Sequence, residues 1–345
     1  MAVNTKLSVS SAILLLALGV AHAESANQIK NNKFFDPDYV AKVGDDFTSR
    51  EIQYGEKVGD VDVVISLGQQ TYPALHKVVE DIARKQGITL DIQQGSCGAT
   101  AKKLLKKTVD IGTYCCPPGK TDRLPGLKFH TIAISPIALT ANSRNSISDV
   151  STSNARKIFQ GQYVSWSEVP EHQSELDRLA GKKIQPVVRL HCKKRPGHWR
   201  SILDSQDEFS PRIESVGTIS DMIKQVSDNA NAIGYETPFM LKANRDKGDL
   251  KILSIDGNHP DDLDKLLKAE YPFYRTYNLT TWVSDNNRNE KAEKLLTALG
   301  KHVEEHAEEY SFISASQLRS SGWKFKDNEL IGEPDGMPVF SERNY

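Results

Sequence analysis

Residues 61–75, VDVVISLGQQTYPAL, carry the pattern that decides the fold of this chain. The β-branched run that ends at Leu67-Gly68 is typical of a strand buried inside a sheet. Past the glycine, apolar side chains recur at helical spacing, at Leu75, Val78, Val79 and Ile82. Charged residues fill the opposite face, which indicates an amphipathic helix. The segment therefore predicts a buried strand, a loop and a helix, the building unit of an α/β protein.

The same alternation of strands and helices continues along the chain. Further strands are predicted at residues 88–92, 109–112, 128–141, 185–190, 232–235 and 272–283. Further helices are predicted at residues 96–108, 154–159, 197–203, 220–226 and 292–306. Such alternation implies a mostly parallel sheet with both faces covered. We expect the long strand at 128–141 to cross between two lobes, and we expect residues 311–345 to form a mixed tail.

The first 23 residues are predicted to be a signal peptide. Lys6 supplies a positive charge, Ala12–Val20 is an apolar run, and Ala21-His22-Ala23 fits a cleavage site. The apolar run is too short to span a bilayer as a stable helix. We therefore expect a soluble chain secreted to the periplasm, without a lipid anchor because no cysteine follows the cleavage site.

The composition is that of an ordinary globular protein. The chain has 345 residues, of which 38% are hydrophobic and 26% charged, enough for two domains or one large one. The formal net charge is −1, whereas nucleic-acid-binding proteins usually show a strong basic excess. Binding to nucleic acid is therefore not expected. The lysines from Lys102 to Lys107 are predicted to form a solvated helix face.

Five segments, in order, resemble the phosphate-binding proteins of ABC importers. They are residues 67–75 (LGQQTYPAL), 95–99 (GSCGA), 109–117 (VDIGTYCCP), 154–169 (NARKIFQGQYVSWSEV), and the pair 232–235 (AIGY) and 271–275 (YPFYR). Each motif alone is weak, but their order and spacing together are specific. The resemblance covers roughly residues 60–320.

The resemblance implies an architecture of two parts. It predicts a type II periplasmic-binding-protein fold, in which two α/β lobes are joined by a two-strand hinge and enclose a ligand cleft. Residues 59–138 and 273–345 are expected to form lobe 1, with residues 139–272 inserted as lobe 2. Residues 24–58 are polar and show no clear periodicity, so they are predicted to be an N-terminal extension.

The resemblance also implies which residues line the cleft. The N-terminus of a helix binds anions, because its N–H groups lack partners within the helix and carry partial positive charge. Three predicted helix starts fall in ligand motifs, and Thr71 and Ser96 there are expected either to cap a helix or to donate to a ligand. The predicted ligand-binding set is Thr71, Tyr72, Ser96, Cys97, Cys115, Arg195, Gly197 and His198.

Cysteines replace polar residues inside these motifs. Cys115 stands where the family keeps a carboxylate, and Cys97 where it keeps a second serine. Cys192 lies in residues 189–199 (RLHCKKRPGHW), which replace the family's anion-binding loop. Thiolates and imidazoles suit thiophilic species such as Cu(I) and Zn(II). We therefore expect the cleft to hold a soft metal ion or metalloid, copper or zinc foremost. The candidate metal ligands are Cys97, Cys115, Cys116, Cys192, His191 and His198.

Two other ligand hypotheses stay open. In one, the cleft binds a tetrahedral oxyanion of the phosphate type, held by helix N-termini, hydroxyl groups and an arginine, either Arg189 or Arg195. In the other, the cysteines are structural. Cys97 paired with Cys115 or Cys116, or Cys192 paired across the cleft, would clamp the lobes of an accessory protein without a transport role.

The expected biochemical role is binding rather than catalysis. Cys192 and His198 could in principle form a nucleophile and its base, but no third orienting group is identifiable, so no catalytic residue is predicted. The partners that the resemblance implies are a small inorganic ligand and the permease of an ABC importer. We expect the chain to be a monomer.

Overall fold

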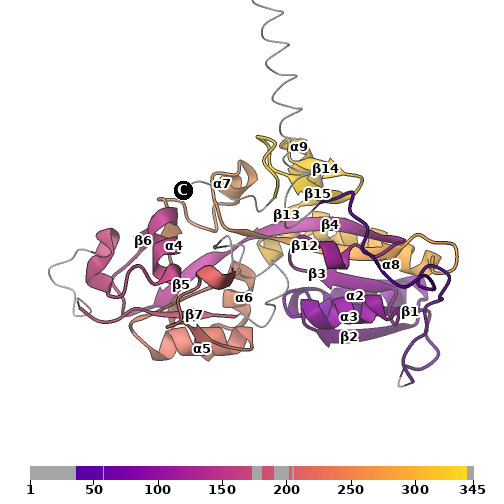
Figure 1. The fold of residues 1–345 in the computed structure, drawn as a ribbon, viewed down its shortest axis with the longest axis horizontal. Coiled ribbons are helices and arrows are strands. Elements are labelled where there is room, and N and C mark those ends of the chain that lie inside the picture. Colours follow the sequence, from indigo (N-terminus) through magenta and orange to yellow (C-terminus); the bar gives the residue numbers. More distant parts are fainter. Residues whose placement is uncertain (1–35, 57, 173–180, 190–201, 204–205, 340–345) are drawn as a thin grey trace, which may run out of the picture.

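Two β-sheets with their covering helices form the two lobes of the molecule (Figure 1). The computed structural model describes residues 36–56, 58–172, 181–189, 202–203 and 206–339. The predicted signal peptide, residues 1–23, lies outside the described residues. No helix in the described ranges is both long enough and apolar enough to cross a membrane.

The lobe 1 sheet has six strands in the order β13-β4-β12-β3-β1-β2. Its strands are β1 (Val63–Gly68), β2 (Leu90–Gly95), β3 (Ile111–Tyr114), β4 (Leu127–Pro136), β12 (Tyr274–Trp282) and β13 (Ile313–Ser314). Its helices are α2 (Tyr72–Gln86), α3 (Cys97–Leu105), α8 (Glu290–Glu305) and α9 (Ala315–Ser320). A hairpin of β14 (Lys324–Lys326) and β15 (Glu329–Gly332) follows.

Alternation along β1 explains how the helices of lobe 1 cover both faces of its sheet. Val63 and Ile65 join a core cluster with the apolar faces of α2 and α8. Val64, between them, joins a different cluster with Cys97 and Leu104 of α3. Because successive side chains of a strand point to opposite faces, α2 and α8 lie on one face of the sheet and α3 on the other.

The lobe 2 sheet has five strands in the order β10-β5-β9-β7-β8. They are β5 (Ala138–Asn142), β7 (Gln185–Val188), β8 (Glu214–Ser215), β9 (Ala232–Glu236) and β10 (Leu250–Ile252). The helices are α4 (Thr152–Gln160), α5 (Ile219–Asp228), α6 (Pro238–Ala243) and α7 (Leu263–Leu267), and β6 (Asp149–Val150) pairs with β11 (Ser254–Ile255). Short 3-10 turns occur at Lys120–Asp122, Trp166–Glu168, Pro170–His172, Gln206–Glu208, Arg245–Lys247 and Ala307–Tyr310.

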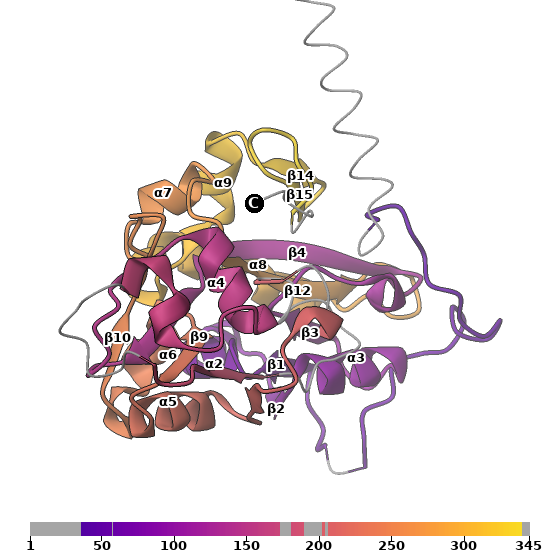
Figure 2. The ribbon, with the colours of Figure 1, turned by 60° about the vertical axis from the view of Figure 1, so that its left-hand side comes forward.

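The chain passes between the lobes at two neighbouring points (Figures 1 and 2). The predicted strand at 128–141 divides there into β4 and β5, with Ile137 between them. The backbone N–H of Ile137 donates to the carbonyl of Phe273 at 2.8 Å, and the Tyr271 hydroxyl donates to the carbonyl of Ile137 at 2.9 Å. The two crossing segments are therefore hydrogen-bonded to each other, as the two strands of a hinge would be.

The expectation of mostly parallel sheets is corrected by the strands next to these crossings. β1 pairs in parallel with β2 and with β3, and β7 pairs in parallel with β8 and with β9. β12, however, runs antiparallel to both β3 and β4, and β5 runs antiparallel to β9 and β10. The reason is that β4 leaves lobe 1 and β12 returns to it, so the two hinge strands point in opposite directions.

The N-terminal extension folds against lobe 1 although residues 36–56 contain no helix or strand. Its Phe47 is buried at 2% exposure and contacts Trp282, with ring centroids 6.2 Å apart. Lys107, predicted to be solvated, is buried instead. Its ammonium group lies 4.7 Å from the ring centroid of Phe47 and donates to the carbonyl of Arg50. The extension thus covers the end of α3, where a solvated lysine face was predicted.

Candidate functional site

The described residues bring a group of polar side chains together where the two lobes meet. We call it the interlobe junction and define it as Gln69, Gln70, Arg189, Glu236 and Arg275, of which all but Gln69 are buried. The glutamines follow β1 of lobe 1, Arg189 follows β7, Glu236 ends β9, and Arg275 is the second residue of β12, beside the hinge. Ligands of open α/β sheets bind outside the carboxyl ends of the strands. Three of these strands end at the junction, so it is the candidate site.

Glu236 is the centre of the hydrogen bonds at the junction. Gln70 Nε2 donates to Glu236 Oε1 at 2.6 Å, and Arg189 Nη2 donates to Glu236 Oε2 at 2.5 Å. Arg189 Nη1 also donates to Gln69 Oε1 at 3.4 Å. Gln69 and Gln70 belong to lobe 1, whereas Arg189 and Glu236 belong to lobe 2. Two hydrogen bonds therefore join the lobes at the junction, the shorter of them to a carboxylate.

Positive charge exceeds negative charge among these side chains. Arg189, Arg275 and Glu236 are each 0% exposed. Burial lowers the pKa of Arg275, but Cys115 and Glu236 raise it, and the net effect is a raised pKa that keeps the guanidinium charged. A buried charge is costly unless an opposite charge compensates it. Among the described side chains of the junction, Arg189 is paired with Glu236, and Arg275 lies within the electrostatic influence of the same carboxylate.

Two buried tyrosines complete the surroundings of the arginines without adding charge. Burial raises the pKa of Tyr235 and of Tyr277, and the nearby arginines lower it by less. Both phenols therefore stay protonated at neutral pH. The hydroxyl oxygen of Tyr235 accepts the backbone N–H of Arg189 at 3.4 Å, which helps to hold the residue at the end of β7.

The loop after β1 is held by threonine hydroxyls. Thr71 Oγ1 donates to the carbonyl of Gly68 at 3.1 Å and lies 2.9 Å from Thr113 Oγ1. Thr71 stands at the N-cap of α2, but its side chain makes no capping bond there. It therefore orders residues 68–71, which carry the junction glutamines. Tyr72, the first residue of α2, is partly buried, and its ring stacks on His76 at 4.6 Å.

The N-terminus of α3 brings partial positive charge to the side of the junction where Arg275 lies. Ser96 Oγ accepts the backbone N–H of Ala99 at 3.2 Å, so the predicted capping role of Ser96 is confirmed. Cys97 is the first helical residue and is buried. The partial positive charge of a helix N-terminus stabilises negative charge within the first turn. Cys97 therefore lies in a local field of the same sign as that of the arginines.

Three buried cysteines gather beside Arg275, and none of them is in a disulfide. The sulfur atoms of Cys97 and Cys115 are 3.1 Å apart. Arg275 Nη1 lies 3.5 Å from both the sulfur and the carbonyl oxygen of Cys115. Hydrogen bonds from Cys116 to Cys115 and Cys97, followed by burial, raise the pKa of the Cys116 thiol well above its usual value. The Cys116 thiol therefore stays protonated at neutral pH.

Of the six predicted metal ligands, only Cys97, Cys115 and Cys116 lie within the described residues. Among the described residues, no group of three or more His, Cys, Asp and Glu side chains is arranged to hold a metal ion. The predicted metal ligands His191, Cys192 and His198 lie outside the described residues, as do Arg195 and Gly197 of the predicted ligand-binding set. Metal binding therefore has no support from the described part of the chain and stays a prediction.

Sequence reasoning missed most of the interlobe junction. Arg189 was considered as an anion ligand, but Gln69, Gln70, Glu236 and Arg275 were not, although all of them lie within or next to the quoted motifs. A usable signal was present. Glu236 ends an otherwise apolar strand, and Arg275 is the second residue of a fully buried one. A charged residue in a buried strand needs a partner, which marks it as a candidate for a site.

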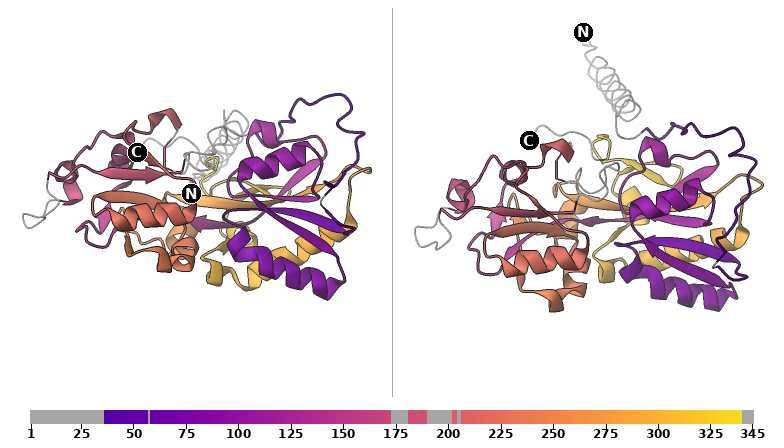
Figure 3. Two further views of the ribbon diagram at one scale, coloured as in Figure 1. Left: turned by 90° about the horizontal axis from the view of Figure 1, so that it is seen from below. Right: turned by 60° about the horizontal axis from the view of Figure 1, so that its bottom comes forward.

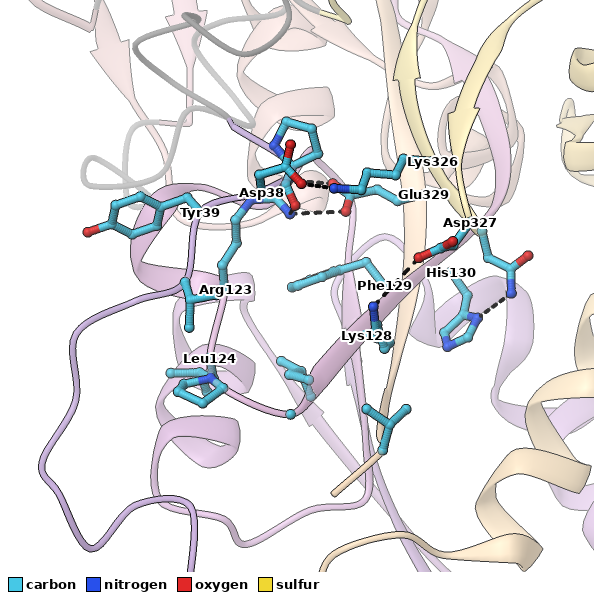
Figure 4. Close-up of a pocket in the computed structure, with 17 residues that line it drawn as sticks. Asp38, Tyr39, Arg123, Leu124, Lys128, Phe129, His130, Lys326, Asp327 and Glu329 are labelled. Atoms are coloured by element: carbon cyan, nitrogen blue, oxygen red, sulfur yellow. Dashed lines mark hydrogen bonds and ion pairs between the residues drawn. The ribbon is translucent and has the colours of Figure 1, made fainter. Parts of the chain in front are cut away.

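A pocket of about 480 Å³ lies away from the junction, between the N-terminal extension and the β14–β15 hairpin (Figure 4). Arg123 donates to both carboxylate oxygens of Glu329, at 3.0 and 2.5 Å. Lys326 pairs with Asp38, and Lys128 with Asp327. These charges of opposite sign compensate one another within the protein. The ion pairs around this pocket therefore hold the extension against lobe 1.

Comparison with known proteins identifies the family. A family model described as the PBP superfamily domain matches residues 51–296. The chain belongs to the PBP superfamily. Proteins named phosphate-binding protein PstS 2, from two strains of Streptococcus agalactiae, are 29% identical to it over 117 residues. That match covers 34% of this chain and 40% of the relatives, so the chain spans about two fifths of the length of these curated relatives.

Solved structures of PBP-type receptors share the fold. An ABC-type phosphate transport receptor from Vibrio cholerae has a TM-score of 0.56 at 19% identity, over 73% of this chain and 99% of the receptor. A putative phosphate ABC transporter substrate-binding protein with bound phosphate, from Clostridium perfringens, has a TM-score of 0.61 at 19% identity, over 73% and 98% of the two chains. The predicted two-lobed α/β fold and the family resemblance are thus confirmed.

Proposed function

We propose that this chain is a solute-binding protein that captures a small oxyanion at its interlobe junction. One observation carries the proposal: two fully buried arginines, Arg189 and Arg275, face a single buried carboxylate, Glu236. An oxyanion adds negative charge beside these two guanidinium groups, and a guanidinium group binds such an anion through paired, charge-assisted hydrogen bonds. The oxyanion hypothesis is therefore preferred to the soft-metal hypothesis.

The surroundings of the arginines support an anion rather than a neutral solute. The capped N-terminus of α3 adds partial positive charge next to Arg275, through Cys97 and Cys115. The Thr71 and Thr113 hydroxyls hold the loop that carries Gln69 and Gln70. Relatives named for phosphate binding point to the same class of ligand. Cys115 takes the place of a family carboxylate, so the selectivity among oxyanions is open to change.

The lobes supply the mechanism of capture. Hinge closure around a ligand is the usual motion of two-lobed binding proteins. Gln70 and Glu236 meet across the lobes at 2.6 Å, and the hinge segments are hydrogen-bonded beside Arg275. An anion that touches arginines from both sides would favour this closed arrangement, because it binds the closed form better than the open one. We further propose secretion to the periplasm and delivery to an ABC permease.

Isothermal titration calorimetry with phosphate and sulfate tests the proposal. We expect one binding site per chain, and Arg275→Gln or Arg189→Gln should weaken binding at least about tenfold, since each removes a hydrogen bond to a charged group worth about 1.5–3 kcal/mol. Arg123→Gln is the matched control: it removes an equally buried arginine from an ion pair outside the junction and should leave affinity unchanged.

Two results would contradict the oxyanion proposal. One is the absence of heat with either anion in wild-type protein that is shown to be folded. The other is stoichiometric copper or zinc that survives dialysis and protects the thiols from alkylation, which would support the metal prediction instead. Binding that is equally weakened by the Arg123 control would also count against the junction as the site.

A further inference from the structure

We propose that Cys97 and Cys115 form a reversible disulfide that controls anion binding at the interlobe junction. The inference rests on the proposed function for its effect on affinity, but not for the bond itself. The two residues are 18 positions apart, one at the start of α3 and the other directly after β3. Their sulfur atoms are already 3.1 Å apart. A disulfide bond is about 2.05 Å long, so each sulfur needs to move by only about half an ångström.

The third thiol of the cluster is excluded from the pair by its position. Cys115 and Cys116 are neighbours in sequence, and a bridge between adjacent cysteines needs a strained backbone. The carbonyl of Cys115, which belongs to the peptide between the two cysteines, accepts a hydrogen bond from Arg275 Nη1 at 3.5 Å, and this bond holds the peptide that such a bridge would have to turn. We assign Cys116 as the thiol that donates hydrogen bonds to the pair and stays reduced.

The charges around the pair favour thiol–disulfide exchange. The nucleophile in this chemistry is a thiolate, and positive surroundings stabilise it. Arg275 Nη1 is 3.5 Å from the sulfur of Cys115, and the first turn of α3 provides a partial positive charge at Cys97. Cys115 is accordingly the attacking residue, and Cys97 is the residue that completes the bond.

A small external disulfide such as oxidised glutathione is the oxidant. The Cys115 thiolate attacks one of its sulfurs, forms a mixed disulfide and releases one glutathione thiolate. Cys97, after losing its proton to solvent, attacks the Cys115 sulfur and releases the second glutathione. The cysteine pair loses two electrons and two protons, and the external disulfide becomes two thiols. The two cysteines are each only 4% exposed, so we expect the exchange to require opening of the lobes.

Oxidation changes the acceptor that Arg275 faces. In the reduced protein, Arg275 Nη1 donates to the Cys115 sulfur at 3.5 Å, and this contact competes with an incoming anion for that donor. In the disulfide the Cys115 sulfur is drawn toward Cys97, so Arg275 Nη1 becomes more available to the anion. We expect the oxidised protein to bind the oxyanion at least about tenfold more tightly than the reduced protein.

Equilibration of the intact protein with oxidised and reduced glutathione, followed by alkylation and peptide mass spectrometry, tests the bond. The expected product is a Cys97–Cys115 linkage that dithiothreitol reverses, formed in wild type and in Cys116→Ser, and absent in Cys97→Ser and Cys115→Ser. A linkage of Cys115 to Cys116 or to Cys192, or full alkylation of all thiols after oxidation, would overturn it. Wild type alone decides this, so a serine variant that fails to fold does not block the test.

Calorimetry with phosphate and sulfate on the oxidised and reduced wild-type forms tests the control of binding. Tighter binding by the oxidised form supports the proposal. Equal affinity in the two forms, or tighter binding by the reduced form, overturns the control while leaving the disulfide standing. If the linkage forms but neither redox form binds either anion, the proposed oxyanion function fails and the control of binding fails with it. Failure of the disulfide, of the redox control and of the proposed oxyanion function therefore each gives a different experimental result.

Discussion

Gln70 of lobe 1 donates a hydrogen bond to the carboxylate of Glu236 of lobe 2 at 2.6 Å, although 166 positions separate the two residues. Both side chains are buried. The second interlobe bond at the junction, from Arg189 to Gln69, is longer at 3.4 Å. The arrangement of the lobes can be followed in the two views of Figure 3, which show them side by side and joined through β4 and β12. Gln70 therefore makes the shorter of the two interlobe bonds at the junction, and we call this bond the latch.

Gln70→Ala should open the lobes in the absence of ligand. A hydrogen bond to a charged acceptor is worth about 1.5–3 kcal/mol, so the ratio of open to closed protein should rise about ten- to a hundredfold. Small-angle X-ray scattering should give a larger radius of gyration, and the buried thiols of Cys97 and Cys115 should be alkylated correspondingly faster. Gln160→Ala is the control, because Gln160 bonds to Glu208 at 3.0 Å within lobe 2. Wild-type scattering and alkylation rates for Gln70→Ala would rule out the latch.

Glu236→Gln should destabilise the protein in a way that an oxyanion repairs. Removing one partner of a buried ion pair costs about 3–5 kcal/mol, because the other charge is left uncompensated. Sulfate or phosphate at constant ionic strength should restore much of the free energy of unfolding measured in urea. Glu329→Gln breaks the buried pair with Arg123 away from the junction, so it should be destabilised but not rescued. Equal rescue of both variants would indicate a general salt effect instead of a site.

Phe47→Ala should loosen the N-terminal extension. Phe47 is buried against Trp282 and below the ammonium group of Lys107, and a buried Phe→Ala change costs about 3–5 kcal/mol. Limited proteolysis should cut the region of residues 36–56 sooner in this variant. Val40→Ala in the same extension is the control, because Val40 is 59% exposed and should have an effect within about 0.5 kcal/mol. Identical digestion of the two variants would contradict a structural role for the extension.

His130 should make the protein less stable in mild acid. Burial lowers the pKa of His130, and Lys128 adds to this while Glu293 opposes it. The unfolded chain, with an ordinary histidine pKa near 6.5, then binds a proton before the folded protein does. The stabilisation is present above that pH and is lost as the pH falls toward the lowered folded value. His130→Gln should flatten this part of the pH profile of the free energy of unfolding, and the exposed His259→Gln should not. An unchanged profile in His130→Gln would exclude His130 as the cause.

Most of the local structure follows from the periodicity of the sequence. The strand at 232–235 became β9, and the helices at 220–226 and 292–306 became α5 and α8 with slightly different ends. These elements are amphipathic or uniformly apolar, so their own residues specify them. The direction of β12 was not predictable in the same way. It depends on where the chain re-enters lobe 1, which is a property of the hinge and not of residues 274–282.

The site was predicted only where a motif marks it. Ser96 caps α3 as expected, and Cys97, Cys115 and Cys116 come together as their motifs suggested. Glu236 and Arg275 carry no motif of their own, and the significance of each arises from a partner in another segment. Thr71 shows the opposite error. A threonine before a helix predicts a cap, but a nearby threonine hydroxyl and the carbonyl of Gly68 bind it instead.

The sequence by itself determined the alternation of strands and helices, the family and the presence of cysteines in three ligand motifs, because these features depend on neighbouring residues or on the order of short segments. Only the tertiary structure decided that Gln70 meets Glu236, that Arg275 lies beside Cys115 and that Lys107 is buried against Phe47. Each of these contacts joins residues far apart in the chain, and its energy comes from burying a charge next to a suitable partner. Which partner is available depends on how the lobes and the extension pack, and a local sequence pattern does not contain that information.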